Sequence, residues 1–342
     1  RPGASWSWPY LTPEERPEPR PELRIPIYEQ DFIDDSYGFR PNTGCHKALK
    51  VLMKSVECKP TNHIVEADIK GFFDNISHEW LMKFLSHRIG DKRVLRMIQR
   101  ILRAGIIEEG KLEKSSKGTP QGGVISPVLA NIYLHYSLDL WFEKVFKKRS
   151  NGYARIIRYC DDFVVCFQVK EDALRFMTAL EERLKKFELE IEPSKTKVVK
   201  FGRYSRENAR RRGVKPDTFD FLGFTHYCST TQDGKRFRMK RKTSNKSFTV
   251  KLKALKEWLK KSRTLATDKL MEGVIVRLRG HFAYYGVSDN SKSLSNFRNE
   301  VIQLLHKWLN RRGKRNSLSW EKFEALLRKY PLPKPKILVS LF

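Results

Sequence analysis

The sequence constrains its own fold most strongly at Asp161 and Asp162, two adjacent acids that stand between two apolar runs. These runs, residues 156–159 and 163–167, are rich in β-branched and aromatic side chains, which is typical of buried strands. The pattern predicts a buried β-hairpin with both acids at its tip. Asp is also common in ordinary turns, because it hydrogen-bonds its own backbone. Neighbouring buried carboxylates are nevertheless costly unless cations offset their charge.

A third acid, Asp68, stands near the end of another apolar run, residues 64–69. Three carboxylates at strand ends can hold two divalent ions roughly 3.5 to 4 Å apart, which aligns the attacking and leaving oxygens in phosphoryl transfer. Magnesium suits sites built only from oxygen ligands, since it keeps some waters and takes substrate phosphates into its shell. The three acids therefore indicate a magnesium site.

The charge of the chain indicates a polyanionic partner. Its 342 residues include 68 Lys+Arg and 39 Asp+Glu, a formal net charge of +29. Residues 201–342 hold 34 Lys+Arg against 11 Asp+Glu, or +23, and residues 1–200 hold 34 against 28, or +6. No apolar run approaches the roughly 20 residues that span a bilayer, so nucleic acid is favoured over a membrane. Five scattered cysteines without zinc-site spacing indicate reduced thiols and an intracellular protein.

Hydrophobic periodicity predicts an α+β fold. Helices are expected over 45–56, 78–88, 91–104, 126–145, 171–187, 268–284, 294–311 and 320–329, with a further helix from about 245. Strands are expected over 64–68, 156–167 (the hairpin), 196–201, 219–228 and 235–240, with a short pair around 106–114. In the helix 171–187, three-to-four spacing predicts the buried face from Leu174, Met177, Leu180, Leu184 and Phe187.

Four segments resemble, in order and spacing, the motifs of reverse transcriptases, in the version of bacterial and organellar group II intron reverse transcriptases, or maturases. These segments are Glu66–Asp74, Gly118–Pro127, Tyr159–Asp162 and Phe221–Phe224. Ser36–Pro41 fits the same group, and Leu278–Gly286 and Trp308–Arg312 are similar to its thumb region. The resemblance covers about residues 25–338.

The resemblance implies a domain order. A proline-rich segment, 1–24, would precede a polymerase right-hand palm over 25–232, which has a ferredoxin-like βαβ core, the acidic hairpin and residual fingers. A basic α-helical thumb, or maturase-specific RNA-binding domain, would follow over 245–338. Only the proline-rich segment precedes Ile25, so we expect the fingers region to be missing or to be supplied by a separate polypeptide.

The resemblance also implies roles for individual residues. Asp68, Asp161 and Asp162 would be the catalytic acids and would hold two Mg²⁺ ions, or Mn²⁺. Phe73 would exclude ribonucleotides by abutting the sugar, and Gln121, Gly122 and Lys195 would lie at the incoming nucleotide. Phe221, Leu222, Gly223 and Phe224 would form the primer grip, and Lys256, Lys260, Arg279, Arg311 and Arg312 would bind RNA phosphates.

Several of these residues have structural alternatives. Phe73 is also compatible with an ordinary core position, and the loop of Gln121 and Gly122 with a plain turn before a helix. Lys197 competes with Lys195 for the role near the nucleotide phosphates, and either is compatible with a solvated lysine. The aromatic residues of the C-terminal region are expected mainly in its core.

The implied function is that of an RNA-directed DNA polymerase, which copies intron RNA into DNA during retrohoming and assists splicing. Its partners would be group II intron RNA, a DNA primer or target, and deoxynucleoside triphosphates. The alternatives are a splicing maturase without polymerase activity and a domesticated, CRISPR-associated or antiphage, reverse transcriptase. The expected location is the cytoplasm of a prokaryote, or an organelle in a eukaryotic host.

Overall fold

The structure, a computed structural model, describes residues 26–103, 106–108, 111–113, 117–119, 125–311 and 318–342. Gln121, Gly122, Arg312 and the proline-rich segment lie outside these residues. Two compact units make up the chain. The sheet unit contains most residues up to Leu222 together with Tyr227–Met239, and the helical unit contains Gly223–His226 and Lys240–Phe342.

A four-stranded sheet organises the sheet unit. It is built from β1 (His63–Ala67), β4 (Ala154–Tyr159), β5 (Asp162–Phe167) and β6 (Lys197–Lys200), in the order β4-β5-β1-β6. Each neighbouring pair is antiparallel, and α7 (Lys170–Lys185) connects β5 to β6. The predicted α+β fold with its acidic hairpin is thus confirmed.

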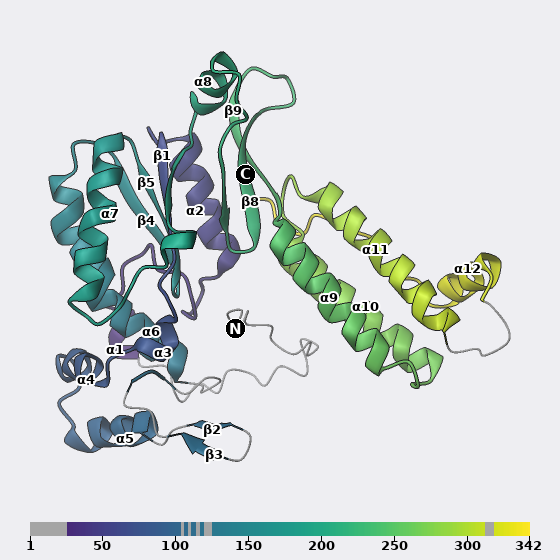
Figure 1. The fold of residues 1–342 in the computed structure, drawn as a ribbon, viewed down its shortest axis with the longest axis horizontal. Helices are drawn as coiled ribbons and strands as arrows, with labels where there is room; N and C mark the ends of the chain where they lie inside the picture. Colours follow the sequence, from purple (N-terminus) through teal and green to yellow (C-terminus); the bar gives the residue numbers. More distant parts are fainter. Residues whose placement is uncertain (1–25, 104–105, 109–110, 114–116, 120–124, 312–317) are drawn as a thin grey trace. The chain divides into compact units, whose positions relative to one another are not determined.

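Helices cover both faces of this sheet, α7 on one side and α2 (Cys45–Glu57) on the other (Figure 1). Side chains alternate along the strands, so that Val65 and Val165 belong to the core shared with α7, whereas Ile64 is buried outside that core. Because both faces are covered, every residue of β5 after Asp162 is buried.

The helix α7 forms as predicted, but its predicted buried face was wrong at its start. Leu174 is 48% exposed, and Phe176 is fully buried instead. The Phe176 ring packs at 5.1 Å from the ring of Phe146 and at 5.5 Å from that of Phe167. Burying a ring of this size contributes about 1.5–3 kcal/mol, so the contact with the sheet decides which helix face turns inward.

Shorter helices and strands complete the sheet unit. They are α1 (Pro26–Glu29), α3 (Phe72–Asn75), α4 (His78–Ser86), α5 (Lys92–Arg103), β2 (Ile106–Glu108), β3 (Lys111–Glu113), α6 (Ser126–Leu134) and α8 (Ser205–Arg211). The helix predicted over 126–145 is interrupted, because two π-helical turns, His135–Asp139 and Phe142–Phe146, follow α6. Such turns insert an extra residue into the helical ladder, which periodicity alone does not reveal.

A second sheet contains β7 (Thr218–Phe221), β8 (Phe224–Thr230) and β9 (Phe237–Thr243). The prediction of one strand over 219–228 was therefore wrong. The chain turns at Leu222 and Gly223, whose φ angles are 50° and 78°. Leucine rarely adopts positive φ, so its side chain gave no signal for this turn.

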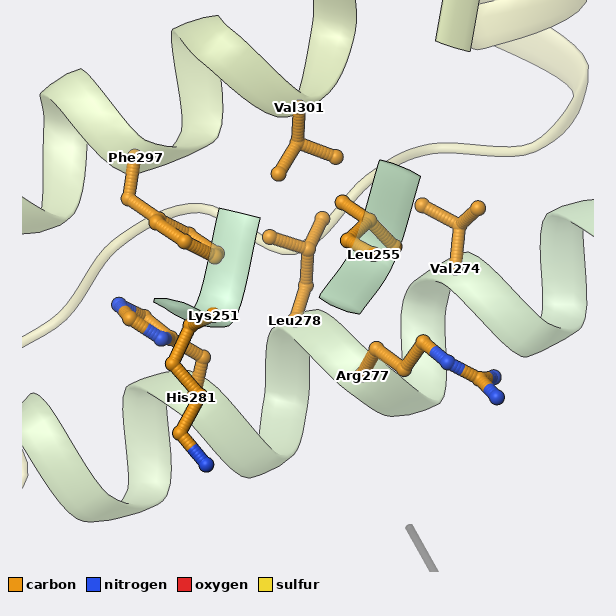
Figure 2. Close-up of a pocket in the computed structure, with 8 residues that line it drawn as sticks. All are labelled: Lys251, Leu255, Val274, Arg277, Leu278, His281, Phe297 and Val301. Atoms are coloured by element: carbon orange, nitrogen blue, oxygen red, sulfur yellow. The ribbon is translucent and has the colours of Figure 1, made fainter. Parts of the chain in front are cut away.

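Among its described residues, the helical unit contains four helices: α9 (Asn245–Lys261), α10 (Thr267–Tyr285), α11 (Ser291–Asn310) and α12 (Trp320–Lys329). Ser244 and Ser319 cap α9 and α12 by accepting bonds from the backbone N–H groups of Ser247 and Lys322. Figure 2 shows side chains of α9, α10 and α11 around a cavity of about 10 Å³. This volume is at the lower limit for one water molecule, so the cavity is not a ligand site.

Within the part of the chain that the structure describes, no helix combines the length and the apolar character needed to cross a membrane.

Candidate active site

The acidic hairpin closes through a two-residue turn. Tyr159 pairs with Asp162 across the strands, which leaves Cys160 and Asp161 as the turn residues. Cys160 adopts a φ of 58°, a conformation that is uncommon for residues other than glycine. Its side chain is buried, so burial raises the pKa of its thiol well above the ordinary value. The turn thus carries Asp161 at its tip and Asp162 at the start of β5.

A neighbouring segment packs directly against this turn. A Cβ atom added to Gly38 would lie only 2.5 Å from the backbone nitrogen of Cys160, so only glycine fits there without a shift. Asn131 on α6 donates from Nδ2 to the Gly38 carbonyl at 2.6 Å, and Tyr37 N–H donates to the Arg158 carbonyl at 2.8 Å. The segment that resembles the family motif at 36–41 therefore buttresses the acidic turn.

A buried charged network lies beneath the turn. The Arg158 guanidinium is fully buried and forms a two-point ion pair with Asp139, at 2.8 and 2.5 Å. The same guanidinium donates to Asn131 Oδ1 at 2.9 Å and to the Cys160 carbonyl at 2.8 Å. Sequence reasoning missed this network, although one signal was present: Arg158 is a charged residue in an apolar strand.

Asp68 follows β1 and lies in the same unit as the hairpin. Its backbone carbonyl accepts a bond from Glu192 N–H at 2.8 Å, and its side chain is about one-third exposed, with 31% of its surface accessible. The Lys195 ammonium forms an ion pair with the Asp68 carboxylate. Lys197 pairs instead with Glu66, at 3.2 Å, so the two lysines that competed in the sequence have different partners.

Burial and neighbouring negative charge raise the pKa of Asp161 and of Asp162. Burial, and next the charge of Asp161, raise the pKa of Asp162 to about 7, although Leu222 N–H donates to its carboxylate at 3.3 Å. Burial also raises the pKa of Asp161, and the charge of Asp68 adds to the effect. Acids in this state gain from a nearby cation, which relieves both burial and repulsion.

The donor set suits a hard divalent cation, because all three acids offer only oxygen ligands. The described residues nevertheless include no group of three or more His, Cys, Asp or Glu side chains close enough to hold a metal ion. The acids are neighbours without converging, and Asp68 is engaged by Lys195.

Phe73 lies on α3 and is partly buried, with its ring packed edge-on against Phe72 at 5.3 Å. Gly118, at a φ of 87°, packs against the backbone of Phe73 and Asp74. Thr119 N–H donates to the Phe73 carbonyl at 2.8 Å. The start of the loop that holds Gln121 and Gly122 thus adjoins Phe73, but those two residues lie outside the described part of the chain.

The remaining predicted site residues fall in two places. Phe221 and Leu222 are buried beside Asp162, whereas Gly223 and Phe224 belong to the helical unit, where the Phe224 ring lies 5.2 Å from that of Tyr285. Of the residues expected to bind RNA, the described ones are all exposed on helices or at a helix end: Lys256, Lys260, Arg279 and Arg311. Exposed cations of this kind are available to phosphates.

The model of the family described as reverse transcriptase (RNA-dependent DNA polymerase) matches residues 22–226. The chain belongs to the reverse transcriptase family. Members of this family generally depend on a divalent metal ion, and their partners include nucleic acids such as RNA. All three carboxylates, Asp68, Asp161 and Asp162, lie inside the matched region.

Curated relatives support the group II intron resemblance that the motifs predicted. The chain is 47% identical over 109 residues to group II intron-encoded protein LtrA of Lactococcus lactis, covering 32% of this chain and 18% of the relative. It is 35% identical over 130 residues to a putative COX1/OXI3 intron 2 protein of Saccharomyces cerevisiae, covering 36% and 14%. The chain therefore spans less than a fifth of these relatives' length.

Among solved structures, telomerase from Candida albicans in complex with a fragment of telomeric RNA is similar, with 14% identity and a TM-score of 0.45. The match covers 90% of this chain and 52% of the telomerase chain.

Proposed function

We propose that this reverse transcriptase is an RNA-directed DNA polymerase of the group II intron type, which copies intron RNA into DNA during retrohoming and binds intron RNA to assist splicing. One observation carries the proposal: the hairpin turn holds Asp161, and Asp162 begins β5, which pairs with β1, the strand that Asp68 follows; burial raises the pKa of both Asp161 and Asp162. Its partners would be intron RNA, a DNA primer or target, and deoxynucleoside triphosphates.

In this proposal Asp68, Asp161 and Asp162 hold two Mg²⁺ ions, or Mn²⁺. When bound, such ions would lower the barrier to attack by a primer 3′-hydroxyl on the nucleotide α-phosphate and stabilise the leaving pyrophosphate. Asp161 reaches from the tip of the turn, while Leu222 N–H fixes the Asp162 carboxylate. Asp162 therefore acts partly as an organiser of the site.

The nucleotide would be selected by the residues beside these acids. Phe73 would abut the sugar and leave no room for a 2′-hydroxyl, and Gln121, Gly122 and Lys195 would lie at the base and phosphates. Phe221–Phe224 would position the primer end, which suits a turn whose backbone already contacts Asp162.

The palm would extend over 25–232 and the RNA-binding thumb over 245–338. In the thumb, Lys256, Lys260, Arg279, Arg311 and Arg312 would contact RNA phosphates, where each cation releases counterions on binding. The charge of +23 in residues 201–342, 34 Lys+Arg less 11 Asp+Glu, supports this role. The protein would act in the cytoplasm of a prokaryote, or in an organelle of a eukaryotic host.

The test is primer extension on an RNA template with deoxynucleotides and Mg²⁺, comparing the parent chain with Asp161→Ala. The variant should lose extension by at least a thousandfold, because one metal-binding carboxylate is gone, while its affinity for folded group II intron RNA stays within about twofold of the parent. Equal extension by the two proteins would sink the polymerase assignment.

A second candidate is a splicing maturase that needs no carboxylate chemistry. The observation that favours it is that Asp68 is engaged by Lys195, so the acids do not converge on one point. If the parent chain promotes intron splicing and both proteins fail equally to extend a primer, this second candidate replaces the first.

A further inference from the structure

Lys195 and Lys197 are a natural pair for comparison, because they lie two residues apart and both are 55% exposed. Each forms one ion pair with an acid of β1 or its end. Lys195 pairs with Asp68, which belongs to the proposed metal site, and Lys197 pairs with Glu66, which lies directly opposite it in the sheet. Comparing the two lysines therefore distinguishes the effect of a cation paired with the proposed metal site from the effect of a cation beside that site.

The backbone around Lys195 is fixed in the position that makes this pair. Glu192 N–H donates to the Asp68 carbonyl at 2.8 Å, and Lys70 N–H donates to the Glu190 carbonyl at 2.9 Å. Lys195 is the last residue of a short helical turn, and its own N–H donates to the Glu192 carbonyl at 3.1 Å. The main chain is held next to Asp68, whereas the half-exposed side chain keeps the freedom to move away.

The Lys195 ammonium is placed to compete directly with a metal ion. It occupies an oxygen of the Asp68 carboxylate, one of the three acids of the proposed metal site. An ammonium and a divalent ion make the same demand on a carboxylate oxygen, namely a lone pair and a negative charge, so they compete for it.

We propose that Lys195 is an internal competitor of the divalent cation, whose ammonium holds Asp68 in the metal-free protein and must leave it before the metal binds. The inference rests on the proposed function, since it takes Asp68 as a metal ligand. It goes beyond that function by assigning Lys195 a role before any nucleotide arrives: it keeps the metal affinity of the free protein low.

The test measures Mn²⁺ binding to the full chain without nucleotide, from the electron paramagnetic resonance signal of free Mn²⁺. Lys195→Met should bind Mn²⁺ about two- to fivefold more tightly than the parent, which corresponds to the loss of one exposed ion pair. Lys197→Met removes the same charge nearby and should change the affinity by less than twofold. Lys195→Arg keeps the competitor and should bind no more tightly than the parent.

Each outcome decides between the two proposals. Mn²⁺ affinity that is equal or weaker in Lys195→Met, while the parent still binds Mn²⁺, overturns the role of Lys195 and leaves the metal site standing. A gain of equal size in Lys195→Met and Lys197→Met also overturns it, because general charge then explains the result. Absence of Mn²⁺ binding in every variant overturns the metal site itself and this inference with it. Circular dichroism of each variant checks that the fold is kept.

Discussion

The acidic hairpin of the sheet unit and the core of the helical unit hold titratable groups of opposite kinds. In the sheet unit, acids gather at the hairpin, and burial raises the pKa of Asp161 and Asp162. In the helical unit, bases are buried instead: burial lowers the pKa of Lys251, and it lowers that of His281 to about 3. Among the acids, Asp68 pairs with the Lys195 ammonium, whereas His281 is buried as a neutral ring. The acidic hairpin thus favours the binding of cations, whereas the surroundings of His281 favour the packing of neutral groups.

The two units also give an arginine different partners. In the sheet unit, Arg158 balances its buried charge with the carboxylate of Asp139. In the helical unit, Arg277 lies over the Trp258 ring, with its Cζ atom 3.7 Å from the ring centre. An ion pair gives directional support to the turn beside it, while a ring gives modest support without adding negative charge to a surface that we propose binds RNA.

The largest effect is expected for Arg158→Met. It should destabilise the sheet unit by about 3–5 kcal/mol, because the Asp139 carboxylate stays buried without its partner. Urea unfolding followed by circular dichroism measures the change. The matched control is Arg155→Met, whose guanidinium pairs with Asp35 at 2.7 Å but whose side chain is 31% exposed; it should cost about 1 kcal/mol or less. Equal costs would break the comparison, since burial would then be irrelevant.

The next effect concerns pH and the helical unit. The folded pKa of His281 lies near 3, below the ordinary value near 6.5, so its contribution to stability is complete above pH 6.5 and is lost as pH falls toward 3. Between pH 7 and pH 4 the parent should lose about 3 kcal/mol through this group. His281→Phe keeps the stack on Phe297 and should remove that loss. The measurement is urea unfolding at several pH values; parallel pH curves for the two proteins would contradict the sealed neutral histidine.

A smaller effect is expected at the hairpin support. Gly38→Ala places a methyl group against the Cys160 nitrogen and should destabilise the sheet unit by about 1–3 kcal/mol, because backbone cannot move aside as a side chain does. It should also reduce primer extension, since the turn carries Asp161. Gly44→Ala is the control: nothing lies within 4 Å of its added Cβ, so its cost should stay within about 0.5 kcal/mol. Thermal unfolding and extension rates measure both variants.

Local patterns predicted the parts of the fold that depend on nearby residues. The hairpin follows from two apolar runs around two acids, and the position of Asp68 follows from the apolar run that it ends. The helix Trp320–Lys329 was predicted to the residue, because Ser319 caps it and the proline at 331 follows it.

The support of the candidate site could not be predicted, because its partners are distant in the sequence. Arg158 lies 19 residues from Asp139, and Lys195 lies 127 residues from Asp68. No periodicity signals such a pairing; it exists only once the sheet and helices have packed. The turn at Leu222 was missed for a different reason, since leucine disfavours the positive φ that the turn needs.

The smallest effect sharpens the comparison of the two arginines. Arg277→Met keeps the length of the side chain but removes the cation over Trp258, so it should destabilise the helical unit by about 1 kcal/mol. Arg279→Met on the same helix changes an exposed residue and should cost less than about 0.5 kcal/mol. Thermal unfolding compares the two variants. The Trp258 ring has room only because residue 273 is glycine: an added Cβ at Gly273 would lie 2.7 Å from the ring. Glycine has a low helix propensity, so the packing of this ring costs some helix stability. If Arg277→Met and Arg279→Met lower the stability equally, the Trp258 ring does not replace a carboxylate as the partner of a cation. The contrast between the units would then rest on the buried histidine alone.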